Sequence, residues 1–398
     1  MWQKIKNIYH LFVSFVATIY FGFPSKKLIV IGVTGTDGKS TTVNMIYHIL
    51  KSAGKKVSMV SSVNAQIGNS VYDTGFHVTT PSPWALQKYL KIAADQKSEY
   101  FIIETTSHAL DQYRVANIKF TIAVITNITH EHLDYHKTWE NLANAKLKLF
   151  TYAQTSVLNL DDRSYTFLKN KIRGKILTYS LNKKSDYSLN NSKIKLKMHG
   201  DYNLSNALAA LAVATSLGIA KSVSENALST FAGIKGRMEE VGLGQPFKVI
   251  IDFAHTPNAL EKALSALNEL KSNNKSKIIA VFGSAGERDS LKRPKMGKSA
   301  AKLADISIIT AEDPRSESVE EISNQIAAGF VGKKEGKDFF KVTDRKEAIE
   351  KAIGLAKPGD IVATFGKSHE KSMCYGKTEY PWDEFAVVKS AIKSALKI

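Results

Sequence analysis

A short glycine-rich loop between an apolar run and a helix-forming segment constrains the fold of this chain most strongly. Residues 28–33 are apolar, and residues 34–42 then read Thr-Gly-Thr-Asp-Gly-Lys-Ser-Thr-Thr. Backbone N–H groups of such a loop, and the N-terminus of the helix that follows, bind anionic oxygens. The lysine and serine of such loops contact terminal phosphates and Mg²⁺. The pattern predicts nucleotide binding by Lys39 and Ser40, although Val33 replaces a glycine of the general spacing.

The rest of the chain alternates short apolar runs with helical stretches. Residues 57–61, 100–104 and 123–127 are predicted to be buried parallel strands, and residues 203–217 an alanine-rich helix. A second series of strands and helices begins near Lys248. This alternation predicts an α/β fold, in which a doubly wound P-loop domain is followed by a smaller Rossmann-like domain.

We expect three parts along the chain. Residues 1–27 form an apolar and basic helix, residues 28–235 the central nucleotide-binding domain, and residues 236–398 the C-terminal domain. The glycine-rich stretch 233–244 is the expected hinge, and the polar, alternating residues 175–198 are expected to form a small β segment or loop at the surface.

Charge and cysteine content limit the possible partners and compartment. The chain has 398 residues, and its 55 Lys and Arg against 37 Asp and Glu give a net charge of +18. This favours an anionic partner, such as a nucleotide, an acidic metabolite, nucleic acid or a membrane surface, without choosing among them. The single cysteine, Cys374, excludes a disulfide framework or a four-cysteine zinc site and indicates a reducing compartment, the cytoplasm.

The N-terminal segment is basic and contains no acid. The apolar run 8–23 lies between two pairs of lysines, and its 16 residues are fewer than the about 20 that a membrane span needs. Polar residues form one narrow stripe at spacings of three and four: Gln3, Asn7, His10, Ser14 and Thr18. The segment is therefore either a helix on the cytoplasmic leaflet of a membrane or a helix docked on its own protein or on a dimer partner.

Two further segments carry metal-binding residue types. Glu104 ends an apolar strand, where a carboxylate is a natural Mg²⁺ ligand beside a phosphate loop. Residues 130–136 contain three histidines and two acids. Their order, H-x-H-x-D-x-H, is one residue out of register with that of metallo-β-lactamase-type zinc hydrolases. A zinc hydrolase and a solvated polar turn remain the alternatives for this segment.

An ordered series of motifs resembles the Mur ligases, and specifically the MurE-type branch, which adds the third residue of the peptidoglycan stem peptide. The resemblance runs from about residue 29 to the C-terminus. The matching segments are residues 35–40, 79–81, 104–108 with Arg114, 126–136 with 144–146, 200–207, 236–239, 252–257, 286–289, 313–315 and 366–370.

The resemblance implies an ATP-dependent carboxylate–amine ligase that uses Mg²⁺. ATP phosphorylates a substrate carboxylate, an amine attacks the acyl phosphate, and phosphate leaves, while the C-terminal domain closes to exclude water. The implied catalytic residues are Lys39, Glu104, His132 and Lys146. The implied metal ligands are Ser40 and Glu104 for one Mg²⁺, and His132 and a carbamylated Lys146 for a second.

Further contacts are carried over from the same family motifs. The implied ATP-binding residues are Gly35, Thr36, Asp37, Gly38, Lys39, Ser40, Thr41, Asn203, Asn206, Arg237 and Asp252. The implied acceptor-binding residues are Thr79, Thr80, Ser107 and Arg114. The implied amino-acid-binding residues are Arg288, Asp313, Arg315, Gly366 and Glu370.

The motif at residues 313–315 bears on the amino acid that is added. MurE-type ligases for meso-diaminopimelate carry D-N-P-R, and this chain keeps the arginine, Arg315, which suits a carboxylate. Asp313 replaces the asparagine and Ser368 replaces the second glycine of G-K-G-H-E. Because a negative Asp313 would repel the substrate carboxylate, diaminopimelate is favoured over lysine but not settled.

The resemblance leaves one region unexplained. MurE-type ligases begin with a domain that binds the uridine nucleotide, and the phosphate loop here begins at residue 34. We expect this domain to be absent and the basic helix to recruit the enzyme to the membrane, where the acceptor is a UDP-linked or lipid-linked muropeptide.

Other functions remain as alternatives. Folylpolyglutamate synthases share the architecture but lack the H-L-D-Y-H and D-P-R combination. MurT-type ligases carry a four-cysteine zinc insert, which one cysteine cannot supply. A non-catalytic nucleotide-binding membrane scaffold is disfavoured by the set of catalytic residues, and no motif indicates nucleic-acid binding.

Overall fold

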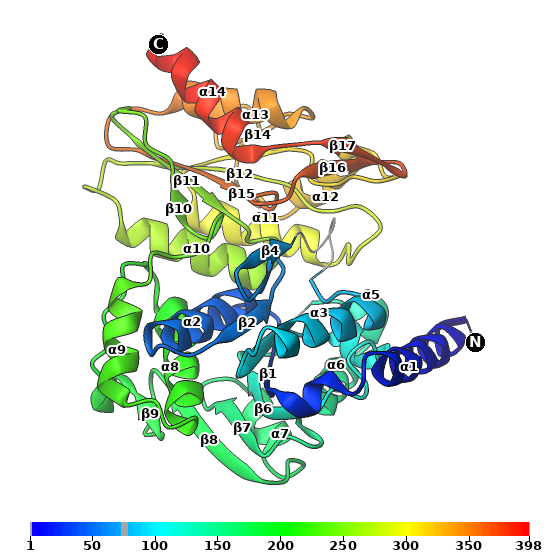
Figure 1. Ribbon diagram of the computed structural model, residues 1–398. Helices are drawn as coiled ribbons and strands as arrows, with labels where there is room; N and C mark the ends of the chain where they lie inside the picture. Colours follow the sequence, from blue (N-terminus) through cyan, green and yellow to red (C-terminus); the bar gives the residue numbers. More distant parts are fainter. Residues whose placement is uncertain (1, 73–78, 130, 398) are drawn as a thin grey trace. The chain divides into compact units, whose positions relative to one another are not determined.

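The computed structural model describes residues 2–72, 79–129 and 131–397 (Figure 1). The chain divides into two compact units. The first unit comprises Met1–Thr129 and Tyr135–Ala232, and the second comprises His130–Asp134 and Gly233–Ile398.

The first unit is built on a nine-stranded sheet in the order β4-β3-β2-β5-β1-β6-β7-β8-β9. Strand β1 lies between β5 and β6 and is parallel to both, whereas β3 and β4 are antiparallel additions at one edge. The strands are β1 (Ile29–Thr34), β2 (Val57–Val60), β3 (Ala65–Ile67), β4 (Ser70–Tyr72), β5 (Tyr100–Glu104), β6 (Phe120–Ile125), β7 (Thr155–Asn159), β8 (Lys175–Ser180) and β9 (Tyr187–Ser188).

Helices cover this sheet, because its central strands are apolar on both faces. Local residues set their first turns: Ser82 accepts a hydrogen bond from the Ala85 amide at the start of α3, and Thr138 accepts one from Asn141 at the start of α6. The helices are α1 (Trp2–Tyr20), α2 (Lys39–Ser52), α3 (Pro83–Asp95), α4 (Ser107–Asp111), α5 (Leu133–His136), α6 (Trp139–Leu147), α7 (Ser164–Leu168), α8 (Asp201–Ser216) and α9 (Lys221–Thr230), with 3₁₀ turns η1 (Pro24–Lys27), η2 (Lys148–Phe150) and η3 (Leu189–Asn191).

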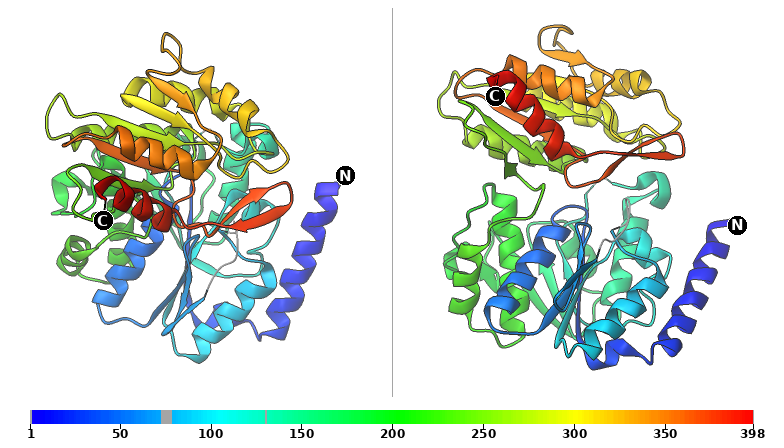
Figure 2. Two further views of the ribbon diagram at one scale, coloured as in Figure 1. Left: turned by 90° about the horizontal axis from the view of Figure 1, so that it is seen from above. Right: turned by 45° about the horizontal axis from the view of Figure 1, so that its top comes forward.

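The second unit has a six-stranded sheet in the order β10-β11-β15-β12-β13-β14 and a separate hairpin, β16–β17. Helices lie over the faces of this sheet (Figure 2). Two apolar clusters, one on each face, pack the sheet against them. The strands are β10 (Glu239–Glu240), β11 (Lys248–Asp252), β12 (Ile278–Phe282), β13 (Ile306–Ile309), β14 (Phe339–Lys341), β15 (Ile361–Phe365), β16 (Ser372–Tyr375) and β17 (Thr378–Pro381), and the helices are α10 (Pro257–Glu269), α11 (Lys292–Leu303), α12 (Val319–Ala327), α13 (Arg345–Leu355) and α14 (Glu384–Leu396).

The predicted α/β class is confirmed, with parallel strands at the centre of both sheets. The segment 175–198 contains two strands, β8 and β9, as expected for a small β segment. These strands extend the main sheet, because β8 pairs with β7 and β9 pairs with β8. No helix among residues 2–72, 79–129 and 131–397 is long and apolar enough to cross a membrane.

Candidate active site

Hydrogen bonds from the two residues that follow β6, Thr126 and Asn127, fix the backbone of the phosphate loop. Thr126 donates its hydroxyl to the Asp37 carbonyl over 2.6 Å, and the Asn127 side chain accepts from the Asp37 amide over 3.0 Å. A Cβ atom on Gly35 would collide with the Thr126 hydroxyl, and Gly38 has a φ of 81° at the start of α2. Both glycines are therefore required, and the loop is fixed in shape.

Lys39 lies in the first turn of α2, beside the loop carbonyls. Its Nζ donates to the Thr36 carbonyl oxygen over 2.7 Å. The ammonium group is thus held at the helix N-terminus, where the partial positive charge of the helix also favours an anion. Lys39 and the loop amides together suit a polyphosphate.

Ser40 and Glu104 meet at the ends of adjacent elements. The register pairs Val33 of β1 with Glu104 of β5, which brings the carboxylate beside the loop. Ser40 donates its hydroxyl to Glu104 Oε1 over 3.0 Å, and the Ser62 amide donates to Oε2 over 2.8 Å. Glu104 is only 1% exposed. A hydroxyl and a carboxylate at this place are hard oxygen ligands of the kind Mg²⁺ takes together with substrate phosphates and water.

Lys146 also reaches the phosphate loop. It lies on α6, is 2% exposed, and donates from Nζ to the Gly35 carbonyl oxygen over 2.6 Å. Lys39, Ser40, Glu104 and Lys146 therefore surround one loop, although they come from three separate regions of the sequence.

The described histidines of residues 130–136, His132 and His136, do not face one common site. Within the described residues, no three His, Cys, Asp or Glu side chains are arranged to hold a metal. His136 is buried and its Nε2 lies 3.0 Å from the Ser107 hydroxyl in the first unit. His132 belongs to the residues that group with the second unit, where its Nε2 lies 3.4 Å from Glu131 Oε1. His130 lies outside the described residues.

The predicted acceptor residues gather at the end of β5. Thr80 donates its hydroxyl to the Glu104 carbonyl over 3.0 Å, and Arg114 donates from Nη1 to the Thr80 carbonyl over 3.0 Å. Ser107 begins α4 just after β5. Burial lowers the pKa of the Arg114 guanidinium. Thr79 adjoins this group.

Asn203 and Asn206 lie on the buried side of α8, as their spacing of three predicts. Asn206 approaches Gly38 closely, and Thr42 donates to its Oδ1 over 3.4 Å. Asn203 donates to the His199 carbonyl over 2.7 Å, while its Oδ1 is buried and has no hydrogen-bond partner among the described residues. A buried acceptor of this kind suits an amino group such as that of adenine.

Arg237 and Asp252 are neighbours in the second unit. The Arg237 guanidinium stacks on the Phe253 ring with its Cζ 4.4 Å from the centroid. Asp252 accepts backbone N–H groups from Met238 and Ala254, both over 2.9 Å. Burial raises the pKa of Asp252, and the charge of Arg237 opposes this rise. Each carboxylate oxygen retains acceptor capacity for a ribose hydroxyl.

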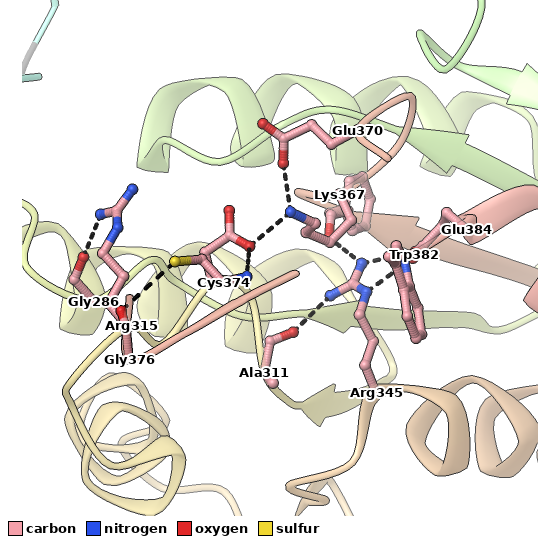
Figure 3. Close-up of polar contacts among 12 residues, drawn as sticks. Gly286, Ala311, Arg315, Arg345, Lys367, Glu370, Cys374, Gly376, Trp382 and Glu384 are labelled. Carbon is pink, nitrogen blue, oxygen red and sulfur yellow. Dashed lines mark hydrogen bonds and ion pairs between the residues drawn. The ribbon is translucent and has the colours of Figure 1, made fainter. Parts of the chain in front are cut away.

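Two of the predicted amino-acid-binding residues, Asp313 and Glu370, contact a buried lysine, Lys367, that sequence reasoning did not single out (Figure 3). Lys367 is fully buried and donates to Asp313 Oδ1 over 2.8 Å and to Glu370 Oε2 over 2.7 Å. Burial alone would lower the pKa of Lys367, but the two carboxylates raise it. Lys367 therefore offsets part of the negative charge of Asp313, which reduces the expected repulsion of a substrate carboxylate.

Two arginines lie next to this cluster. Arg315 donates from Nη1 to the Gly286 carbonyl over 2.6 Å. The Arg288 side chain is partly covered by its neighbours and partly open to solvent, and it makes no hydrogen bond or ion pair within the described residues. Partial burial and the positive charge of Arg315 lower the pKa of Arg288. Two guanidinium groups that repel each other gain most from a shared carboxylate.

The backbone is strained at the same place. Four non-glycine residues here have left-handed φ angles of 44° to 52°: Glu287, Asp313, Arg315 and Ser368. Ser368, which replaces a family glycine, is held by a hydrogen bond of 2.5 Å to the Gly236 carbonyl. Such conformations persist only where surrounding contacts enforce them, and they cluster at functional sites.

Comparison with protein families identifies the fold. A family model described as the Mur ligase middle domain matches residues 33–214, and one described as the Mur ligase glutamate ligase domain matches residues 236–368. The chain belongs to the Mur ligase family.

Named relatives support this assignment. This Mur ligase is 39% identical to a UDP-N-acetylmuramyl-tripeptide synthetase of Borreliella burgdorferi, over 97% of this chain and 80% of the relative. It is 35% identical to a UDP-N-acetylmuramoyl-L-alanyl-D-glutamate–2,6-diaminopimelate ligase of Syntrophomonas wolfei, over 96% of this chain and 82% of the relative.

Solved structures of related proteins have the same fold. A structure of a UDP-N-acetylmuramoyl-L-alanyl-D-glutamate–2,6-diaminopimelate ligase aligns with a TM-score of 0.60 and 30% identity, over 92% of this Mur ligase and 78% of that chain. A folylpolyglutamate synthase of Mycobacterium tuberculosis aligns with a TM-score of 0.69 at 16% identity, over 96% and 94% of the chains, which shows the shared fold alone.

Proposed function

We propose that this Mur ligase joins an amino acid, meso-diaminopimelate, to a muramoyl-L-Ala-D-Glu acceptor through an acyl phosphate, in the synthesis of peptidoglycan precursors. The observation that carries the proposal is the arrangement of Lys39, Ser40, Glu104 and Lys146 around one fixed phosphate loop. We place the reaction in the cytoplasm, at the inner face of the membrane.

The chain's own residues account for the first step. ATP lies on the loop amides, with Asn203 and Asn206 on its adenine or phosphate side. The family motifs that contain Arg237 and Asp252 imply two further contacts to ATP. Lys39 leaves the Thr36 carbonyl and neutralises the γ-phosphoryl group as it moves to the acceptor carboxylate, with ADP as the leaving group.

Mg²⁺ supplies charge neutralisation on the phosphates when bound. Ser40 and Glu104 would hold one ion, and His132 with a carbamylated Lys146 would hold another. The amine of the amino acid then attacks the acyl carbon, and phosphate leaves from the tetrahedral intermediate.

The arginine pair supports the choice of diaminopimelate. The side chain of diaminopimelate ends in a carboxylate beside an amine, and this carboxylate suits the guanidinium groups of Arg315 and Arg288. Gly366 and Glu370 complete the amino-acid site. Thr79, Thr80, Ser107 and Arg114 would hold the acceptor near Glu104.

The test is phosphate release from ATP by the purified chain. We expect release to require both UDP-muramoyl-L-Ala-D-Glu and an amino acid, and to exceed the release with either one alone. Release that requires a folate and glutamate instead would favour the folylpolyglutamate-synthase-like alternative. Binding of ATP without release under any of these conditions would favour a non-catalytic scaffold.

Arg315→Lys is expected to raise KM for diaminopimelate by about 10- to 100-fold, because a bidentate, charge-assisted contact of about 1.5–3 kcal/mol is lost. KM for ATP should not change. The matched control is Arg173→Lys on the surface of the first unit. Equal KM values for diaminopimelate in Arg315→Lys and the control would contradict this role of Arg315.

Lys146 is expected to be active as a carbamate, which CO₂ forms on its amine. Removing dissolved CO₂ should lower the rate of phosphate release at least severalfold, and adding bicarbonate should restore it. Lys146→Arg keeps a positive charge but should be inactive and insensitive to bicarbonate. A fully active enzyme in CO₂-free buffer would contradict the carbamate.

A further inference from the structure

Helix α1 docks on the first unit through its polar side. Asn7 donates to the Asp111 carbonyl over 3.1 Å, and Ser14 donates to the Ala116 carbonyl over 2.5 Å. Ser14 and Thr18 are almost completely buried. The polar stripe predicted from the sequence is thus the docked side, and it lies against the turn that follows α4.

The opposite side of α1 is apolar and faces solvent. Its members are between 50% and 67% exposed: Ile5, Ile8, Tyr9, Phe12, Phe15 and Ile19. We call these six residues the outer face of α1. Surface helices normally bury such residues and expose the polar ones. The reversed polarity of α1 therefore indicates that something apolar covers the outer face.

Aromatic residues extend this surface beyond the end of α1. Tyr20, Phe23 and Trp84 are each at least 41% exposed. The Tyr20 and Trp84 rings lie 5.0 Å apart, and the ammonium of Lys26 lies 4.5 Å from the Phe23 ring centroid. Aromatic rings next to lysines are typical of the interface between lipid headgroups and acyl chains.

The positive charge of residues 1–27 distinguishes two possible partners of the outer face, a second copy of the chain and an anionic membrane. Residues 1–27 contain no acid, and Lys6, Lys26 and Lys27 are exposed. A second copy of the chain would place the same basic, acid-free segment against itself. An anionic membrane surface attracts these lysines by about 1 kcal/mol each and accepts the apolar side chains at the same time.

We propose that α1 lies flat on an anionic lipid bilayer, with its outer face among the lipid chains and its polar stripe holding the first unit. The helix attaches to the surface without spanning, in agreement with its 19 residues and the absence of any membrane-crossing helix in the described part of the chain. Figures 1 and 2 show α1 at the margin of the first unit, as such an attachment requires. The inference does not depend on which reaction the enzyme catalyses.

The experiment measures binding of the full chain, without substrates, to vesicles of phosphatidylglycerol and phosphatidylcholine and to vesicles of phosphatidylcholine alone. The variant Ile8→Gln/Phe12→Gln/Phe15→Gln removes apolar area without changing charge. The variant Lys6→Gln/Lys26→Gln/Lys27→Gln removes charge and keeps the outer face. The matched control is Val331→Gln, an 88% exposed apolar residue of the second unit.

We expect the wild type and Val331→Gln to bind anionic vesicles equally. Each triple variant should bind them on the order of 100-fold more weakly. Thermal unfolding and phosphate release without vesicles should not change, because the substituted side chains face solvent. Equal binding by wild type and the apolar variant would overturn the proposal. So would a wild-type dimer that the apolar variant dissociates, since a second copy would then cover the outer face.

Discussion

Lys39→Met is expected to lower the rate of ATP-dependent phosphate release by at least about 10³-fold, which corresponds to about 4 kcal/mol of transition-state stabilisation. Methionine keeps the approximate length of the side chain but removes the one positive charge within the loop, residues 34–42. Among the described residues, the Lys39 ammonium makes its one hydrogen bond to the Thr36 carbonyl of its own loop, so its replacement should leave the fold unchanged. The rate is measured with saturating acceptor and amino acid.

The control for Lys39→Met is Lys51→Met, an exposed lysine in the last turn of the same helix, α2. It should retain the wild-type rate. Nucleotide binding and thermal unfolding of both variants separate a loss of chemistry from a loss of structure. If Lys39→Met released phosphate at more than a tenth of the wild-type rate, the phosphate loop would not work as proposed.

The largest expected effect on stability concerns a buried ion pair in the second unit (Figure 3). Arg345 and Glu384 are at most 1% exposed and are joined by two hydrogen bonds of 2.9 and 2.7 Å. Arg345 also donates to the carbonyls of Ala311 and Phe365, and its pKa is raised by Glu384 against the effect of burial. The pair thus connects α13, α14 and the end of β15.

Arg345→Met is expected to destabilise the second unit by about 3–5 kcal/mol, because it leaves the Glu384 carboxylate buried without a counter-charge. Hydrogen exchange of the β15 amides in denaturant measures this loss within the unit. Lys346→Met, at the exposed neighbouring position, is the control and should change stability by less than about 0.5 kcal/mol.

The double variant Arg345→Met/Glu384→Leu should recover part of the lost stability, since neither charge is then left alone. A loss below about 1 kcal/mol in Arg345→Met would show that the pair does not hold these elements together.

The positions of the main strands along the chain could be predicted because hydrophobic runs and glycine-rich turns are local signals. Strands β3 and β4 could not, since three residues are too few to show a period. The link of β8 to the main sheet depends on pairing with β7, which no local pattern contains.

In the candidate site, too, local motifs could be predicted from the sequence, but contacts between residues far apart in the sequence could not. The loop with Lys39 and Ser40 follows from spacing, whereas Ser62 reaches Glu104 through a backbone amide that carries no sequence signal. Lys367 is part of the G-K-S-H-E motif at residues 366–370. Its role as counter-charge to Asp313 depends on a contact 54 residues away.

Helix α1 illustrates a third case. The spacing of the polar residues predicts the stripe, but it does not show whether the stripe faces the protein or the solvent. Ser14 faces the protein because its partner, the Ala116 carbonyl, is 102 residues away in sequence. Only the structure shows that the apolar side is left outside.

The most direct test of the proposed reaction follows the oxygen atoms of the acceptor carboxylate. UDP-muramoyl-L-Ala-D-Glu labelled with ¹⁸O in the reacting carboxylate is incubated with ATP, diaminopimelate and the enzyme, and the phosphate and peptide are analysed by mass spectrometry. The account predicts one ¹⁸O atom in each phosphate released and a tripeptide product that contains diaminopimelate. Unlabelled phosphate, or no tripeptide from a folded enzyme that binds ATP, would contradict it.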